Sequence, residues 1–175
     1  MKIVDDDDNT LGPGEKGEIC ARGKHIMMGY WNNPELTARV LKGGWYHTGD
    51  MGFMDEDGYI YMTDRKADMI ISGGENVYPK EVEDVIYSHP AVKECTVVSS
   101  PSGKWGEIVQ AVVVLRPGAA ATEEEIIEHC KKTLAGYKCP KAVAFWDDIP
   151  KTIVGKIMKK EIKQKFWEGK GRMIS

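Results

Sequence analysis

Lys156 is the residue whose position points most directly to chemistry. It follows a glycine in the basic segment Pro150-Lys-Thr-Ile-Val-Gly-Lys-Ile-Met-Lys159, in a loop that leads to a predicted helix. A positioned ammonium group can stabilise negative charge that develops on phosphate oxygens during a reaction. The alternative is one more solvated lysine beside Lys151, Lys159 and Lys160. The motifs upstream decide between the two interpretations.

Two upstream segments carry groups that could bind a nucleotide. His47-Thr-Gly-Asp50 places the Asp50 carboxylate at a predicted strand end, where it could accept hydrogen bonds from a ribose diol. Arg65 follows a predicted strand, and its planar guanidinium can bridge hydroxyl and phosphate groups. The competing interpretations are a turn aspartate that satisfies its own backbone, and a weak surface ion pair of Arg65 with Asp64 or Asp68.

Three further segments have the composition of ligand-binding loops. They are the glycine-rich turn Ser72-Gly-Gly-Glu-Asn-Val-Tyr-Pro79, the loop Lys104-Trp-Gly106 between two strands, and Gly136-Tyr-Lys-Cys-Pro-Lys141. The first lacks the lysine and the spacing of a phosphate-binding loop. Each has a structural alternative, namely a helix entry, a tryptophan that caps the core, and solvent-exposed lysines.

The pattern up to about Asp64 predicts short strands broken by turns. Gly17–Arg22 alternates like a strand, and Asp55–Gly58 has the composition of a hairpin turn before the strand Tyr59–Thr63. Asn33 is the predicted cap of a short helix that continues to Arg39.

The second half of the chain alternates helices with strands. Helices are predicted from Pro79 to Pro90, from the capping box Thr122-x-x-Glu125 to Gly136, and over Lys159–Trp167. Valine-rich or apolar strands are predicted over 94–99, 108–115 and 142–146. The composition changes near Asp64–Asp68, which is where we expect the domain boundary.

Composition limits the function classes. A net charge of -3 does not suggest nucleic-acid binding, and 42% hydrophobic content is ordinary for a globular protein. There is no apolar run that could span a membrane and no secretory signal. Cys20, Cys95, Cys130 and Cys139 form no C-x-x-C pair, so a cytoplasmic, reduced setting without a disulfide framework is expected. The acidic run Asp5–Asp8 is interpreted as a solvated turn.

In their order along the chain, these motifs resemble the C-terminal part of the adenylate-forming acyl-CoA synthetases, the AMP-binding family of fatty-acid and aromatic-acid CoA ligases, from roughly Gly12 to Phe166. Those enzymes activate a carboxylate with ATP and pass the acyl group to a thiol. The resemblance implies an α+β fold. Residues 1–65 would be a small β-rich subdomain, a distorted barrel, that ends a large N-terminal adenylation domain, and 66–175 would be the mobile C-terminal domain.

The resemblance also implies a role for each motif. Lys156 would be the catalytic lysine that binds the substrate carboxylate and the α-phosphate, with Asp50 and Arg65 holding ATP or AMP. The CoA-binding candidates are Gly73, Gly74, Glu75, Trp105, Tyr137, Lys138 and Lys141. The hinge candidates are Arg65, Lys66 and Ala67, where the family usually has aspartate or lysine at the position of Ala67. Cys139 stands where some relatives have arginine, so no role is transferred to it.

The implied enzyme is an AMP-forming acid–thiol ligase that uses ATP, Mg²⁺ with ligands outside this chain, and CoA as co-substrate. Its partners would be a carboxylic acid, with fatty acids favoured, and the missing N-terminal domain. The chain alone is expected to be inactive and to self-associate through exposed apolar surface. Two alternatives stay open: an adenylation protein that charges a carrier-protein thiol, and a non-catalytic nucleotide- or CoA-binding module.

Overall fold

The computed structural model describes residues 1–168. The chain divides into two compact units, Met1–Ala67 and Asp68–Ser175. No helix among the described residues is long and apolar enough to cross a membrane.

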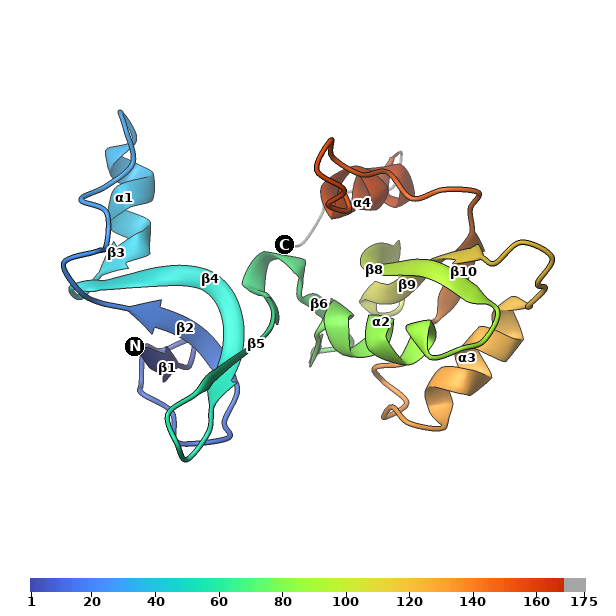
Figure 1. The fold of residues 1–175 in the computed structure, drawn as a ribbon, viewed down its shortest axis with the longest axis horizontal. Helices are drawn as coiled ribbons and strands as arrows, with labels where there is room; N and C mark the ends of the chain where they lie inside the picture. The colour runs from blue at the N-terminus through green and yellow to red at the C-terminus, as the bar shows by residue number, and fades with distance from the viewer. Residues whose placement is uncertain (169–175) are drawn as a thin grey trace. The chain divides into compact units, whose positions relative to one another are not determined.

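The first unit is built on a strongly curled sheet of five antiparallel strands (Figure 1). They are β1 (Lys2–Val4), β2 (Gly17–Ala21), β3 (Leu41–Lys42), β4 (Trp45–Met54) and β5 (Ile60–Arg65). The long strand β4 pairs with β3 near its start and with β5 near its end, while β2 pairs along both parts. The sheet confirms the predicted β-rich fold of this part of the chain.

The segment His47–Asp50 lies inside β4, so the prediction that it ends a strand was wrong. Cys20 pairs with His47 and Glu18 pairs with Met51. Only Ile19 separates the two positions on β2, whereas three residues separate their partners on β4. The extra residues form a bulge in which Gly49 has a φ of 73°. A bulge bends a strand and redirects its side chains, and pairing resumes beyond it.

The predicted helix in the first unit is confirmed as α1 (Pro34–Val40). The Asn33 side chain accepts a hydrogen bond from the Leu36 backbone N–H at 3.0 Å, as a cap does. The hairpin turn before β5 is also present, because Asp55 N donates to the Tyr59 carbonyl at 3.0 Å.

The second unit contains a five-stranded sheet in the order β10-β9-β6-β7, with β8 paired to β9. Its strands are β6 (Ile70–Ser72), β7 (Glu75–Val77), β8 (Val92–Ser102), β9 (Gly106–Leu115) and β10 (Ala142–Phe145). Its helices are α2 (Pro79–Tyr87), α3 (Glu123–Lys131) and α4 (Lys159–Trp167). The pairs are antiparallel except for β10 and β9, which are parallel. The predicted α+β class is confirmed.

Both faces of this sheet are buried, which explains its unbroken valine runs. Val109, Ala111 and Val113 of β9 belong to the core beneath α2 and α3. Val112 and Val114 alternate with them and belong to the core beneath α4, on the opposite face (Figure 1). Successive strand side chains point to opposite faces, so a strand covered on both sides is apolar throughout.

The capping box that opens α3 is confirmed. Glu125 N donates to Thr122 Oγ1 at 3.2 Å, and Thr122 N donates to Glu125 Oε2 at 2.8 Å. The predicted end at Gly136 was wrong, because α3 ends at Lys131. Leu134 N still donates to the Cys130 carbonyl at 2.8 Å, so a turn closes the segment before the glycine is reached.

The four cysteines are buried free thiols. Burial raises the pKa of Cys20 and of Cys130 to about 11, so both thiols stay protonated and unreactive near neutral pH.

Glu83 of α2 is a buried carboxylate that connects three elements. One of its oxygens accepts hydrogen bonds from the Thr96 hydroxyl at 3.0 Å and from Val97 N at 2.8 Å, both on β8. The same oxygen lies 2.8 Å from Lys159 Nζ at the start of α4. A buried carboxylate is tolerated only when donors surround it, and here they come from β8 and α4.

We therefore expect Glu83→Ala to lower the free energy of unfolding by about 3 kcal/mol, because it leaves the Lys159 ammonium and a buried backbone N–H without their partner. Urea denaturation measures the change. Asp84→Ala is the matched control, since it removes the neighbouring exposed pair with Lys80 and should change stability by less than about 0.5 kcal/mol. Equal losses in the two variants would contradict the role given to Glu83.

Candidate functional site

The structure brings Asp50 and Arg65 together. They face each other across the β4–β5 pairing, and Arg65 Nε lies 3.3 Å from Asp50 Oδ1. Their side chains are 28% and 60% exposed, respectively. Asp50 is thus an ion partner of Arg65, while Asp64 Oδ1 accepts the Arg65 backbone N–H at 2.8 Å. The pair presents a carboxylate acceptor and a guanidinium donor at one surface position.

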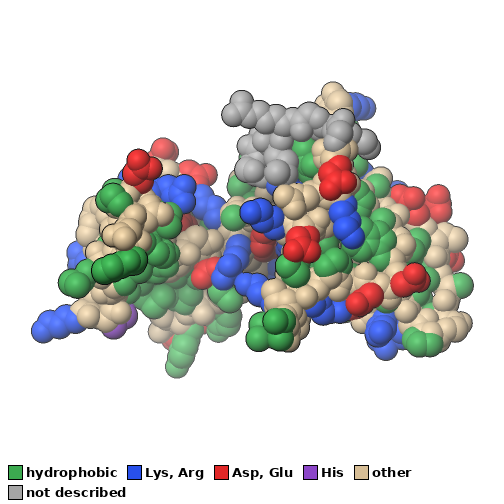
Figure 2. Space-filling model, turned by 90° about the horizontal axis from the view of Figure 1, so that it is seen from above, with side chains coloured by type: hydrophobic (Ala, Val, Ile, Leu, Met, Phe, Trp, Pro, Cys, Tyr) green, Lys and Arg blue, Asp and Glu red, His purple; other side chains and the backbone are tan. Residues whose placement is uncertain are grey.

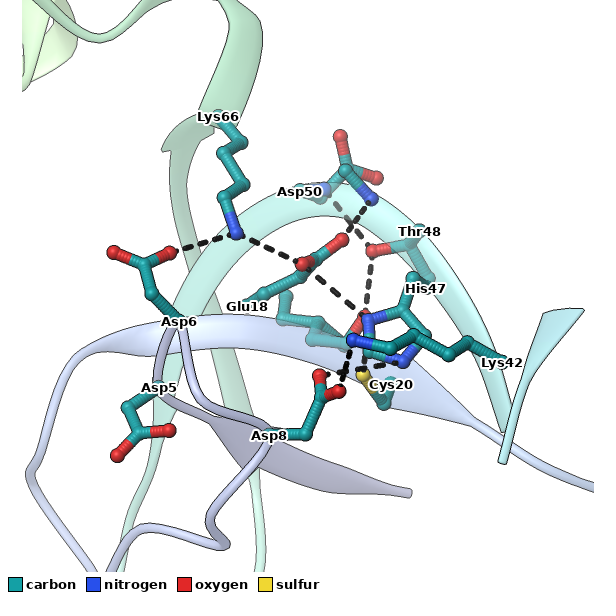
Figure 3. A network of polar contacts seen from close by, with 12 residues as sticks. Asp5, Asp6, Asp8, Glu18, Cys20, Lys42, His47, Thr48, Asp50 and Lys66 are labelled. Carbon is teal, nitrogen blue, oxygen red and sulfur yellow. Dashed lines mark hydrogen bonds and ion pairs between the residues drawn. The ribbon is translucent and has the colours of Figure 1, made fainter. Parts of the chain in front are cut away.

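The Asp50 backbone is held in place by the residues of the bulge. Thr48 Oγ1 donates to the Ile19 carbonyl at 2.8 Å and accepts from Asp50 N at 3.0 Å. Gly49 N donates to Glu18 Oε1 at 3.0 Å (Figure 3). These bonds fix the direction in which the Asp50 side chain leaves the strand.

Glu18 is a member of this network that was not predicted from the sequence. Its side chain is only 10% exposed, and every residue of β2 is buried. A glutamate in the middle of a strand with apolar neighbours is the signal that could have found it, since glutamate is almost never buried without partners. The partners themselves come from elsewhere in the chain, so their identity could not be predicted locally.

Lys66, a predicted hinge residue, lies within the same network. Its Nζ is 2.9 Å from Asp6 Oδ1 and 3.2 Å from Glu18 Oε2 (Figure 3). Burial lowers the pKa of Lys66, but the hydrogen bonds to Asp6 and Glu18 raise it more, so the net shift is upward. The lysine is therefore held as an ammonium. Ala67, the other hinge candidate, follows it in a short 3-10 helix over Lys66–Asp68.

The acidic run at 5–8 is exposed but is not simply solvated, so that interpretation was incomplete. Asp6 pairs with Lys66, and Asp8 pairs with Lys42. Asp8 Oδ1 also lies 3.7 Å from His47 Nε2 (Figure 3). The run thus supplies negative charge to lysines that come from distant parts of the chain.

Gly73 and Gly74 form the two-residue turn of the β6–β7 hairpin, with φ angles of 62° and 88°. Two positive φ angles in succession are typical of tight hairpins and favour glycine. The predicted glycine turn before a helix is present, because α2 begins at Pro79, but the two short strands that flank the glycines were not predicted.

The structure also brings Trp105 to this turn. Gly73 N donates to the Trp105 carbonyl at 3.1 Å, and the indole ring is 46% exposed. A Cβ atom on Gly73 would lie 2.8 Å from Trp105 Cε3. Two of the predicted CoA-binding positions are thus adjacent, and the absence of a side chain at Gly73 leaves room for the ring.

The segment Tyr137–Lys141 was predicted to meet the CoA nucleotide, but its two lysines make contacts within the protein. Lys138 Nζ lies 2.7 Å from Glu81 Oε1, and this hydrogen bond raises the Lys138 pKa. Lys141 Nζ donates to the Gly136 carbonyl at 2.9 Å, while the Tyr137 ring is 41% exposed. Lys138 Nζ also lies 5.8 Å from the centroid of the Tyr137 ring, so this lysine would have to leave both Glu81 and the ring to meet a ligand phosphate.

Lys156 lies on a tight hairpin. Lys151 and Ile157 form an antiparallel bridge across it. Thr152 N donates to the Lys156 carbonyl at 2.8 Å, and Lys156 N donates to Thr152 Oγ1 at 3.1 Å. Gly155, with a φ of 81°, allows the chain to reverse just before the lysine. The lysine backbone is therefore rigidly held while its side chain is exposed.

The neighbouring lysines differ from Lys156 in their contacts. Lys151 pairs with Glu94 at 2.7 Å, and Lys159 pairs with Glu83 at 2.8 Å. Within residues 1–168, no ion pair occupies Lys156, so its ammonium is available to a ligand. This contrast separates Lys156 from Lys151 and Lys159.

The described residues hold no group of three His, Cys, Asp or Glu side chains arranged to bind a metal ion.

Comparisons with known proteins show which family this chain is similar to. Residues 81–156 match the family model for the AMP-binding enzyme C-terminal domain. The chain is 46% identical over 172 residues to a long-chain-fatty-acid–CoA ligase of Escherichia coli O157:H7, which covers 98% of this chain and 30% of that protein. It is 49% identical over 166 residues to a feruloyl-CoA synthase of an Amycolatopsis species, covering 95% and 34%.

A solved structure shows the same fold. The crystal structure of ATP-bound MatB from Rhodopseudomonas palustris superposes with a TM-score of 0.90 at 36% identity, over 96% of this chain and 34% of that one. The chain spans about a third of the length of the curated relatives it matches. It belongs to the adenylate-forming, AMP-binding enzyme family, in which it corresponds to the C-terminal portion.

The glycine turn yields a stability prediction. Gly74→Ala should cost about 1–2 kcal/mol, because alanine is strained at positive φ, and nothing lies within 4 Å of an added Cβ there. Gly73→Ala should cost more, because the same strain is joined by the clash with Trp105. Urea denaturation of both variants measures the difference.

The Trp105→Ala background is the control for that comparison. Without the indole ring, the two glycine substitutions should cost the same. If Gly73→Ala remains the more harmful change in that background, the contact with Trp105 is not the cause.

Proposed function

We propose that this chain is the C-terminal portion of an ATP-dependent acyl-CoA ligase, an AMP-forming acid–thiol ligase that adenylates a carboxylic acid and transfers the acyl group to CoA. The observation that carries the proposal is the exposed Lys156 on its hairpin, which forms no ion pair within residues 1–168, between Lys151 and Lys159, which are paired. The names of the similar ligases favour a fatty acid or an aromatic acid as substrate.

In the adenylation half-reaction, a carboxylate oxygen of the substrate attacks the α-phosphorus of ATP and pyrophosphate leaves. Asp50 would accept hydrogen bonds from the ribose hydroxyls, and Arg65 would donate to the nucleotide. Negative charge grows on the α-phosphate oxygens as the bond forms. The Lys156 ammonium would stabilise that charge more strongly in the transition state than in the ground state.

In the second half-reaction, the CoA thiol attacks the acyl carbonyl of the adenylate and AMP leaves. We propose that the Gly73–Gly74 turn and Trp105 contact the narrow pantetheine arm, with Glu75 at the start of the next strand. Tyr137 would stack on the adenine of CoA, and Lys141 would meet its phosphates. Glycines suit this role because a slim ligand can approach their backbone closely.

The two half-reactions need different groups beside the same acyl centre. We propose that rotation at Arg65, Lys66 and Ala67 exchanges the Lys156 hairpin for the Gly73–Trp105 surface. A hinge requires only a few residues that absorb a change in φ and ψ. Ala67 can adopt ordinary backbone angles, so alanine at this position permits the rotation.

One observation favours a carrier-protein thiol as the alternative acceptor. Lys138, predicted to meet CoA phosphates, is paired with Glu81. A carrier-bound pantetheine arm lacks the nucleotide of free CoA, so it would not need this lysine. Assaying the whole protein with free CoA and with a pantetheinylated carrier protein distinguishes the two acceptors.

Hydrophobic side chains on the surface of the first unit fit the expectation that this chain packs against further protein (Figure 2). Met28 and Trp31 are 99% and 92% exposed. We propose that the remaining adenylation domain covers part of this surface. Self-association of the isolated chain through it stays a prediction, tested by light scattering.

The test of the proposed function is Lys156→Ala in the whole protein. ATP–pyrophosphate exchange dependent on the acid should fall about 100- to 1,000-fold, the usual effect of removing one group that stabilises transition-state charge. Thioester formation from a supplied acyl-adenylate should continue, because that step does not build charge on an attacked phosphate.

Lys160→Ala is the matched control, since Lys160 is an exposed lysine of α4 in the same basic segment. It should leave the exchange rate unchanged. Unchanged exchange in Lys156→Ala would remove Lys156 from the reaction, and absence of exchange in the unmodified protein would overturn the enzyme proposal and support the binding-module alternative.

A further inference from the structure

Glu18 is a buried carboxylate that contacts two segments with different proposed roles. Its Oε1 accepts from Gly49 N at 3.0 Å, in the bulge that carries Asp50. Its Oε2 lies 3.2 Å from Lys66 Nζ, in the proposed hinge, and 3.4 Å from His47 Nδ1 (Figure 3). One side chain therefore connects the nucleotide-binding bulge with the hinge.

Because Glu18 is buried, losing any of these contacts would cost free energy. A carboxylate removed from water is destabilised strongly unless hydrogen-bond donors or a positive charge replace the lost solvent. Gly49 and His47 belong to the same strand as Asp50 and stay with it. Lys66 is the lysine that balances the charge of Glu18, and it belongs to the segment whose backbone is proposed to rotate.

Lys66 has a second partner that allows it to leave. Asp6 lies 2.9 Å from its Nζ, and the Asp6 side chain is 80% exposed. If the hinge backbone rotates, the pair with exposed Asp6 is inexpensive to lose. The pair with Glu18 is not, because its loss leaves the carboxylate with fewer donors in a buried position.

We propose that Glu18 is a positioning residue that couples nucleotide binding at Asp50 to the position of the hinge through Lys66. The inference rests on the proposed function for the roles of Asp50 and the hinge. With Lys66 in contact, Glu18 is balanced and holds Gly49, so the Asp50 bulge is ordered to bind nucleotide. When Lys66 withdraws, Glu18 loses its counter-charge, the bulge loosens, and AMP is released more readily.

Coupling between two sites is reciprocal. Nucleotide bound at Asp50 therefore favours the hinge position in which Lys66 contacts Glu18. This would keep the hinge in one position until the nucleotide has reacted.

The first experiment measures hydrogen exchange of peptides that cover 47–50 in the whole protein without ligand. Lys66→Met and Glu18→Gln should both exchange faster there than the unmodified protein. Asp6→Asn is the matched control, because it removes only the exposed partner of Lys66, and it should leave exchange unchanged. No effect of Lys66→Met would overturn the coupling, whether or not the protein proves to be a ligase.

The second experiment measures the two half-reactions in the same variants. Lys66→Met and Glu18→Gln should each raise the KM for ATP by about fivefold to tenfold, a usual range for coupling between sites, with a smaller effect on kcat. The double variant should be no worse than either single one, because both break the same contact. Additive losses, or an equal loss in Asp6→Asn, would overturn the proposal.

Two outcomes separate this inference from the proposed function. If the unmodified protein shows ATP–pyrophosphate exchange but the variants bind ATP normally, the coupling is wrong and the ligase proposal stands. If the unmodified protein shows no exchange, the ligase proposal fails, while the hydrogen-exchange comparison still tests whether Lys66 and Glu18 hold the bulge that carries Asp50. Lys66→Met keeps the test available if Glu18→Gln does not fold, since the Lys66 side chain is partly exposed.

Discussion

A carboxylate buried in a protein is stable only when donors replace the water it has lost, and both units of this chain depend on that constraint. Glu18 holds the bulge of β4, and Glu83 joins α2, β8 and α4. Glu107 is 1% exposed and accepts from the Ser99 hydroxyl at 3.1 Å and from Ile71 N at 3.4 Å. In each case one carboxylate binds the backbone of a segment distant in sequence. The hydrogen bonds therefore restrict the position of that segment.

These buried groups support exposed turns that carry the candidate chemistry. Asp50 follows the bulge held by Glu18, and the hairpin of Lys156 leads directly into α4, whose first residue pairs with Glu83. A charged side chain can act on a ligand only if it is accessible, yet it must be positioned within a fraction of an ångström. The chain meets both needs by exposing the side chain and fixing the backbone beside it.

Local features of the chain were predictable because neighbouring residues satisfy one another. Asn33 caps α1 and Thr122 forms a capping box with Glu125, since both pairings close within one helical turn. The valine runs indicated strands for the same reason, because alternation and apolar content are visible in any short window. The hairpin of Lys156 is also local, and its glycine marked the loop.

The sequence by itself therefore determined most of the element types, the α+β class and the positions of the exposed candidate residues. Only the tertiary structure decided which of them meet. The bulge at Gly49 depends on register with β2, and the ion pairs of Lys66 with Glu18 and of Lys138 with Glu81 join residues far apart in sequence. Such pairs form when folding removes both groups from water together. A short stretch of sequence does not indicate which distant residue will be the partner.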